Sequence, residues 1–115
     1  MKELGKSLLV TGFGYELSEL WERNMILFKR LTKITQGVRR IGSAAVDLCH
    51  VACGKVDGFW EYELHPWDTA AGILIVEEAG GNVSQMDGSA YSIFDNQILT
   101  SNSLIHEDMK RVINS

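Results

Sequence analysis

Segments with the residue pattern of a strand alternate with segments that have the pattern of a helix along the whole chain. The strand-like segments are 7–11, 38–41, 55–64, 82–86 and 97–100. Apolar residues at helical spacing predict helices over 17–35, 44–53, 66–79 and 104–113. Because such alternation is typical of α/β proteins, we expect a mixed, largely parallel sheet flanked by helices.

The helical segment 66–79 is the most apolar part of the chain. Its middle, Ala70 to Val76, has almost no polar side chain on any face. Pro66 suits the first position of a helix, and Gly80 and Gly81 follow as a stop. A helix that is apolar all round is covered on most sides. We therefore expect this helix to be buried within a single domain that spans 1–115.

The bulk composition excludes several classes of partner. The 115 residues carry a net charge of -4, and 45% of them are hydrophobic. This charge offers no basic field for a nucleic acid or a membrane surface. No apolar run approaches the roughly 18 residues of a membrane span, and the first residues lack the apolar stretch of a signal peptide. We expect a cytoplasmic protein that binds neither nucleic acid nor membrane.

The helical segment 44–53 carries both cysteines of the chain. Cys49 and Cys53 would share a face, but their side chains would hardly reach the geometry of a disulfide. We expect buried, reduced thiols. Asp47 and His50 are placed on the opposite, polar face, with His50 solvated or ion-paired. His106 is expected on the surface of the last helix.

The aromatic residues near the centre of the chain have structural explanations. Trp21, Trp60 and Trp67 are interpreted as packing residues rather than a stacking platform. His65 directly precedes Pro66, so a structural role at the start of the helix is favoured over substrate contact.

Three carboxylates cluster where the strand 55–64 passes into the helix 66–79. They are Glu61, Glu63 and Asp68. In open α/β sheets, ligands bind at the carboxyl ends of strands. Asp68 would lie in the first helical turn, where the helix dipole favours an anion. A hard cation such as magnesium needs oxygen ligands, so Asp68 can be one metal ligand. From spacing alone, a simple dipole partner is the favoured interpretation of Asp68.

Four segments together resemble one protein family. Residues 67–72 read Trp-Asp-Thr-Ala-Ala-Gly, and after an apolar run 78–81 read Glu-Ala-Gly-Gly. This pattern resembles the second signature motif of the inositol monophosphatase family. The segments 8–13, 39–45 and 56–61 resemble the same family, so the resemblance covers essentially the whole chain. It implies the carboxy-terminal domain of the layered fold of these magnesium-dependent sugar phosphatases.

The resemblance also implies roles for individual residues. Asp68 matches the family's metal-ligand aspartate for Mg²⁺, and Glu61 matches the carboxylate that accepts hydrogen bonds from substrate hydroxyls. Gly42, Ser43 and Ala44 match the segment that lines the polyol site. Physically, backbone N–H groups at a helix N-terminus and the Ser43 hydroxyl can bond sugar hydroxyls there. Ser43 is also a good N-cap, and both roles can hold together.

The family's first signature is missing from this sequence. That motif reads Asp-Pro-(apolar)-Asp-Gly-Thr, but the only proline here is Pro66. We therefore assign no catalytic residue to this chain and expect an incomplete magnesium site. The resemblance implies a parent that hydrolyses inositol monophosphate to inositol and phosphate, whereas the chain alone should be inactive. Its expected partner is the missing amino-terminal half or a second chain.

Two alternatives stay open at this point. The chain could be a split or truncated product that acts only by association, and the apolar surface left bare by a missing half would favour a homo-oligomer. The parent could instead act on histidinol phosphate, fructose bisphosphate or adenosine bisphosphate, whose phosphatases share the Trp-Asp motif. Glu61 favours a polyol among these substrates.

Overall fold

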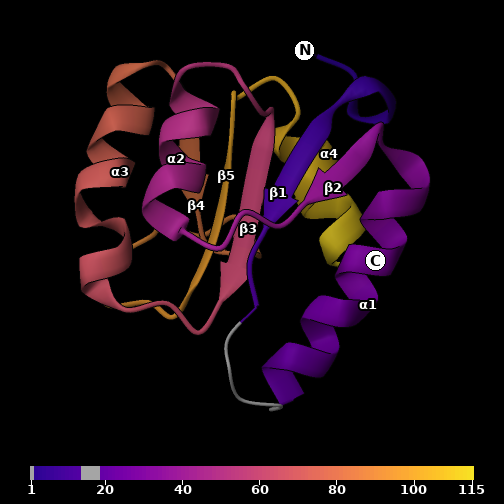
Figure 1. The fold of residues 1–115 in the computed structure, drawn as a ribbon, viewed down its shortest axis with the longest axis horizontal. Coiled ribbons are helices and arrows are strands. Elements are labelled where there is room, and N and C mark those ends of the chain that lie inside the picture. The colour runs from indigo at the N-terminus through magenta and orange to yellow at the C-terminus, as the bar shows by residue number, and fades with distance from the viewer. Residues whose placement is uncertain (1, 14–18) are drawn as a thin grey trace.

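The computed structural model describes residues 2–13 and 19–115, so the expected helix start at Leu17 lies outside the described part. The elements follow the predicted order (Figure 1). The strands are β1 (Leu8–Thr11), β2 (Gly37–Arg39), β3 (Gly58–Tyr62), β4 (Asn82–Ser84) and β5 (Gln97–Ser101). The helices are a short 3-10 turn η1 (Leu4–Lys6), then α1 (Glu19–Ile34), α2 (Ala44–Ala52), α3 (Pro66–Glu78) and α4 (His106–Ile113).

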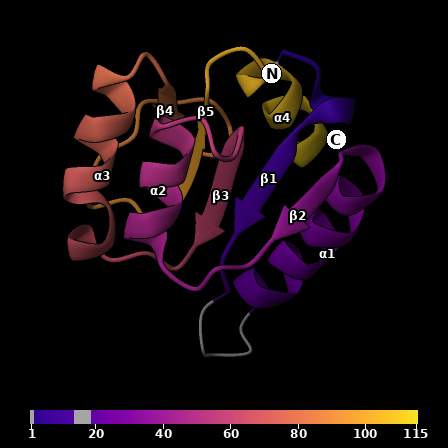
Figure 2. The same cartoon turned by 45° about the horizontal axis from the view of Figure 1, so that its top comes forward.

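The five strands form one mixed sheet in the order β2-β1-β3-β5-β4 (Figure 2). β1 pairs in parallel with β2 and with β3, while β5 pairs antiparallel with β3 and with β4. The mixed α/β class is thus confirmed, with two parallel and two antiparallel pairings. The loop 85–96 joins β4 to β5 without a helix, whereas parallel neighbours are usually joined by a crossover helix, so the antiparallel pairing of β4 and β5 is the usual arrangement.

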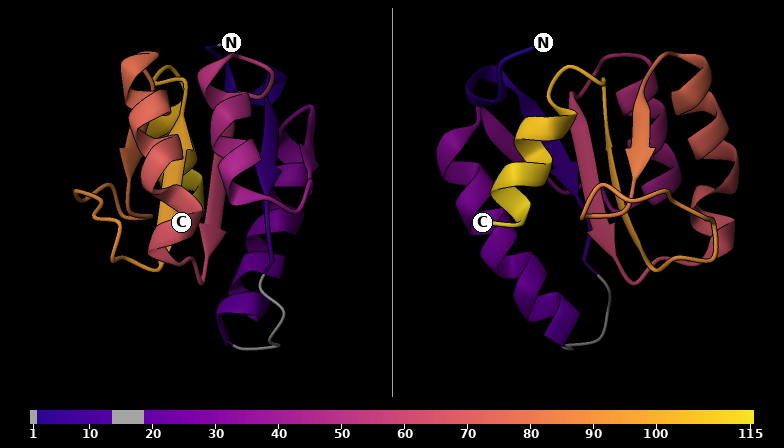
Figure 3. Two further views of the ribbon diagram at one scale, coloured as in Figure 1. Left: turned by 60° about the vertical axis from the view of Figure 1, so that its left-hand side comes forward. Right: turned by 180° about the vertical axis from the view of Figure 1, so that it is seen from behind.

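Helices cover both faces of the sheet. α1 and α4 lie on one face, and α2 and α3 lie on the other (Figure 3). The side chains of three neighbouring strands alternate between the two cores, as a pleated strand requires. One core takes Leu9, Trp60 and Leu99, and the other takes Val10, Phe59 and Ile98. The site described below therefore rests on strands that are buried on both sides.

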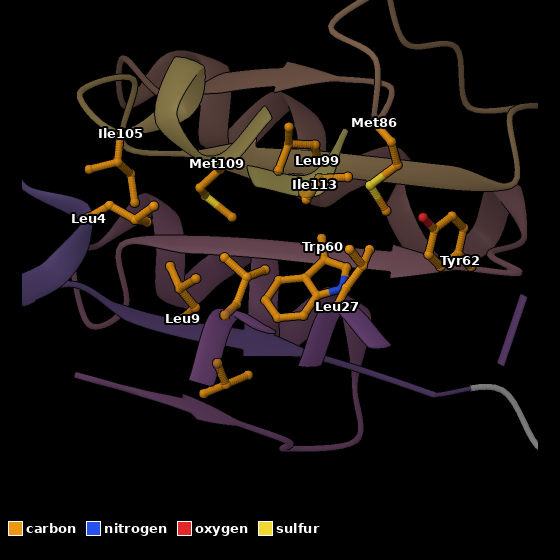
Figure 4. Packing of buried hydrophobic residues seen from close by; sticks show 12 residues of the cluster. Leu4, Leu9, Leu27, Trp60, Tyr62, Met86, Leu99, Ile105, Met109 and Ile113 are labelled. Atoms are coloured by element: carbon orange, nitrogen blue, oxygen red, sulfur yellow. The ribbon is translucent and has the colours of Figure 1, made fainter. Parts of the chain in front are cut away.

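Trp60 lies at the centre of the core under α1 and α4 (Figure 4). Its indole N–H donates a hydrogen bond to the side-chain oxygen of Asn24 on α1. The Asn24 amide in turn donates to the carbonyl of Gly12, at a distance of 2.8 Å. Because all polar atoms in this chain of contacts are paired, burial of the indole costs little. The packing role expected for Trp60 is confirmed, and the contacts fix α1 against the end of β1.

α2 and α3 pack closely against each other on the opposite face. Gly72 makes this possible, because a Cβ atom there would lie 2.6 Å from a side-chain carbon of Leu48. Only Thr69, Gly72 and Val76 of α3 are buried. The expectation that this helix is covered on most sides is therefore wrong. A single sheet can cover one side of α3, and the described residues place nothing over the other side.

The bare side of α3 carries large apolar residues. Trp67 is 77% exposed, Leu74 is 61% exposed and Ile75 is 46% exposed. The packing role expected for Trp67 is thus wrong within the described part of the chain. We call Trp67, Leu74 and Ile75 the α3 stripe. Apolar surface gathered in this way is typical of a face that another element covers.

α2 is rotated relative to the sequence-based expectation. Leu48 and Val51 face the sheet, and Asp47 is completely buried beside them. Cys49 and Cys53 are exposed. The predictions of a polar face containing Asp47 and of buried thiols are therefore wrong. The segment is apolar on nearly all sides, so the fit of Leu48 against Gly72 decides which residues turn inward.

His106 is buried, which corrects the expected surface position. Its two ring nitrogens lie 2.8 Å from the Ser84 hydroxyl oxygen and 2.9 Å from that of Ser101. Burial lowers the pKa of the His106 imidazole. The neutral ring can therefore tie the start of α4 to β4 and β5. Among the described helices, none combines the length and the apolar character needed to cross a bilayer.

Candidate active site

A groove of about 1000 Å³ lies at the end of the sheet where the parallel strands terminate. There the carboxyl ends of β1, β2 and β3 meet the N-termini of α2 and α3, at the lower edge in Figure 1. In α/β folds this edge is the usual position of a ligand site. The groove lining contains every site residue selected from the sequence: Gly42, Ser43, Ala44, Glu61 and Asp68.

The segment 42–44 forms the start of α2. Ser43 is the N-cap, and its hydroxyl oxygen accepts a hydrogen bond of 3.3 Å from the Val46 N–H. Gly42 has a positive φ of 96°, a conformation that favours glycine. The capping role expected for Ser43 is therefore confirmed. Its contact with a substrate stays a prediction, which is compatible with capping because a hydroxyl can make further hydrogen bonds.

Glu61 projects from β3 toward the end of β1. A Cβ atom at Gly12 would overlap the Glu61 carboxylate, so a larger residue at position 12 would displace this carboxylate from its present position. Burial and the negative charges of Asp47 and Asp68 raise the pKa of Glu61 to about 7, while Arg40 acts in the opposite direction. Near neutral pH the Glu61 carboxyl can thus accept hydrogen bonds when ionised and donate one when protonated.

Asp47 is a neighbour of the site that could not be recognised from the sequence. It is fully buried in the first turn of α2, and neither carboxylate oxygen has a hydrogen-bond partner among the described residues. Burial raises the pKa of Asp47 to about 6. The sequence does contain one indication that Asp47 is buried. Asp47 is next to Leu48 and lies on the side of α2 that also carries Ala44 and Val51.

Asp68 lies at the third position of α3, at the rim of the groove. One of its carboxylate oxygens accepts a hydrogen bond of 3.0 Å from the His65 N–H, so it helps to cap the helix. Carboxylate oxygen is the ligand type that magnesium prefers. Across 2–13 and 19–115, however, no group of three or more His, Cys, Asp or Glu side chains could hold a metal ion. Asp68 can supply one ligand to a metal whose remaining ligands come from elsewhere.

His65 and Trp67 form one wall of the groove. Their rings are stacked with centroids 4.4 Å apart and an interplanar angle of 12°. His65 is the N-cap residue of α3, which agrees with the structural role expected at the start of this helix. The stack holds the exposed indole in a fixed orientation beside Asp68.

Comparisons with known proteins agree with this arrangement. A model of the inositol monophosphatase family matches residues 1–115. Over 101 residues the chain is 57% identical to the phosphatase IMPL1, chloroplastic, of Arabidopsis thaliana, covering 88% of this chain and 27% of that protein. It is 51% identical over 110 residues to the inositol-1-monophosphatase of Synechocystis sp., covering 96% of this chain and 38% of the relative.

Solved structures show the same similarity in three dimensions. An inositol monophosphatase from Anabaena (Nostoc) sp. superposes with a TM-score of 0.87 at 47% identity, covering 99% of this chain and 45% of that structure. The chain therefore spans less than half the length of these relatives. The match nevertheless extends over nearly all of its own residues, including the groove and both flanking helices. On these grounds the chain belongs to the inositol monophosphatase family.

Proposed function

We propose that this chain forms the substrate-binding side of a magnesium-dependent phosphomonoesterase that hydrolyses inositol monophosphate to inositol and phosphate. The observation that carries the proposal is the groove, which brings the segment 42–44, Glu61 and Asp68 together at the ends of three strands. These residues come from three different elements, the start of α2, the strand β3 and the first turn of α3, which the fold brings to one end of the sheet.

Each of these groups has a distinct task in the proposed site. The N–H groups that open α2 and the Ser43 hydroxyl bind hydroxyls of the polyol. Glu61 accepts hydrogen bonds from further hydroxyls and so fixes the orientation of the ring. Asp68 provides an oxygen ligand for Mg²⁺. When bound, the metal supplies charge stabilisation for the phosphate and activation of water.

The proposed site is incomplete within this sequence. The chain has no Asp-Pro pair, and its described residues hold no cluster that could bind a metal by itself. The remaining metal ligands and the water-activating groups must come from a partner, which we propose to be a missing amino-terminal half or a second chain. A cytoplasmic location also stays a prediction.

Substitution of Glu61 tests the role of this residue in a protein completed by the missing half. Glu61→Gln should raise the KM for inositol monophosphate by roughly 10- to 100-fold, because a hydrogen bond to a charged group contributes about 1.5–3 kcal/mol. The Mg²⁺ concentration for half-maximal rate should change little, whereas Asp68→Asn should raise it strongly. Steady-state kinetics over both concentrations separate the two effects.

Glu77→Gln is the matched control for this experiment. Glu77 is an exposed carboxylate near the far end of α3, outside the groove, so its substitution should change neither parameter. If Glu61→Gln altered the Mg²⁺ requirement as much as the KM for the polyol, the assignment of Glu61 to substrate would be wrong.

The α3 stripe supports association as a second role of the chain. Its large apolar side chains are exposed in the isolated chain, and burial of such surface drives protein association. We propose that isolated chains associate through this stripe as homo-oligomers, and that the missing half takes the same place in a complete protein.

Polar substitution of the α3 stripe tests this association. The double variant Leu74→Gln/Ile75→Gln should shift the chain from oligomer to monomer in sedimentation equilibrium without loss of stability, because both positions are exposed. Val76→Gln serves as the contrast, since Val76 is fully buried and its replacement should destabilise the fold by roughly 2–4 kcal/mol. A wild-type chain that stays monomeric at all concentrations would refute this role.

A further inference from the structure

The two cysteines of the chain lie on the outward side of α2, away from the groove. Cys49 and Cys53 are free thiols, and both are exposed. Neither residue belongs to the lining of the groove, which includes only the N-terminal end of this helix. The thiols therefore form a feature of α2 that the proposed phosphatase function does not use.

The backbone fixes the spacing of the two thiols. The Cys53 N–H donates to the Cys49 carbonyl at 3.0 Å, which closes one helical turn between them. Side chains four residues apart then lie on the same face, with Cβ atoms about 5–6 Å apart. A disulfide needs Cβ atoms about 3.5–4.5 Å apart. An S–S bond would thus require this turn to open.

A bridging metal ion can join two sulfur atoms that lie farther apart than the sulfurs of a disulfide. Bonds from thiolate sulfur to metal are about 2.3 Å long for zinc, so one ion can join sulfurs up to about 4.6 Å apart. The Cys53 thiol makes only a weak contact of 3.7 Å with the His50 carbonyl, which a metal bond can replace. Gly54 follows Cys53 with a φ of 81°. A Cβ atom placed on Gly54 would have no other atom within 4 Å, so no other part of the chain crowds this end of the helix.

The number of ligands selects the kind of ion. Thiolate sulfur is a soft ligand that favours Cu(I), zinc and iron–sulfur clusters. Zinc sites take four ligands, or three together with water. Within 2–13 and 19–115 no set of three metal-binding side chains converges, so only two sulfurs are available here. An ion that is satisfied by two thiolates is therefore favoured.

We propose that Cys49 and Cys53 form a dithiolate binding site for a soft monovalent cation of the Cu(I) type. Two S–H protons leave to solvent as two Cu–S bonds form, and no oxidation state changes. The ion closes the last turn of α2 in the geometry that the helix already has. The proposal is independent of the phosphatase function, because the site and the groove share no residue.

Competition for Cu(I) tests this site on the 115-residue chain itself. The reduced chain, kept without oxygen, is titrated with Cu(I) against the chromophoric chelator bicinchoninate. The wild type should take up one Cu(I) per monomer. Cys49→Ser and Cys53→Ser should each lower the affinity by roughly 100-fold or more, because loss of either ligand removes the chelate effect. Both positions are exposed, so neither change should affect the far-UV circular dichroism spectrum.

Further measurements separate the proposed site from nonspecific thiol binding. Native mass spectrometry should show one copper ion per chain in whatever oligomer is present, and copper should protect both thiols from alkylation. The control His50→Gln should retain the wild-type affinity. A single-serine variant with undiminished affinity, or uptake of only one copper ion per two chains, would overturn the proposal. Either result would leave the phosphatase assignment untouched, since phosphate release is measured separately.

Discussion

Asp47→Asn is expected to raise the free energy of unfolding of the chain at pH 8 by roughly 1–3 kcal/mol. The reason is that Asp47 is fully buried and neither oxygen has a partner among the described residues. At pH 8 the folded chain must keep an uncompensated charge in its interior. Asparagine has nearly the same shape without the charge, although its amide group also lacks partners and this reduces the gain.

The pH dependence gives the sign of this effect. Burial raises the pKa of Asp47 from 3.8 to about 6 in the folded chain, so the folded state holds the proton more tightly than the unfolded state. The stability associated with this proton is fully present below pH 4 and is lost as the pH rises through 6. The change in the pKa of Asp47 from 3.8 to about 6 corresponds to about 3 kcal/mol, which is the upper limit of the gain.

Urea unfolding of the wild type and the variant at pH 4, 6 and 8 measures this difference. The free energies of unfolding of the wild type and the variant should approach each other at pH 4 and differ most at pH 8. Asp108→Asn is the control, because Asp108 forms an exposed ion pair with Arg111 at 2.8 Å and should change stability by less than about 1 kcal/mol. A loss of stability on Asp47→Asn at pH 8 would show that the Asp47 charge has a favourable partner after all.

The second large effect concerns catalysis. The isolated chain is expected to show no magnesium-dependent phosphate release above background, although it carries the groove. Phosphoryl chemistry on metal ions depends on a clamp around both the attacking and the leaving oxygen. Asp68 supplies one ligand, and in 2–13 and 19–115 no group of three or more His, Cys, Asp or Glu side chains could hold a metal ion. Joining the chain to the amino-terminal portion of a relative should therefore increase the rate by several orders of magnitude.

The α/β class could be predicted from local patterns in the sequence, whereas the candidate site residues were selected through the family resemblance and their roles stay predictions. Ser43 lies where a cap is needed, and it does cap α2. Glu61 and Asp68 lie at the junction of a strand and a helix, and the topology of the sheet brings that junction to the segment 42–44. Residues at the ends of neighbouring strands meet whatever the details of packing.

The rotation of α2 and the exposure of α3 could not be predicted in the same way. Nearly every position in α2 is small or apolar, so periodicity does not distinguish the buried side from the exposed one. The contact between Leu48 and Gly72 sets the rotation of α2 about its axis. In this rotation Asp47 faces inward and the cysteines face outward. The apolar pattern of α3 indicates cover on two sides, but the described chain contains only one sheet.

The most direct test of the proposed function is phosphate release from inositol monophosphate with Mg²⁺, measured for the chain alone and for the chain joined to the amino-terminal portion of a relative. We expect the chain alone to remain at background and the joined protein to turn over, with Asp68→Asn abolishing most of that turnover. Robust magnesium-dependent turnover by the isolated 115 residues would contradict the conclusion that this chain holds only the substrate-binding side of the site.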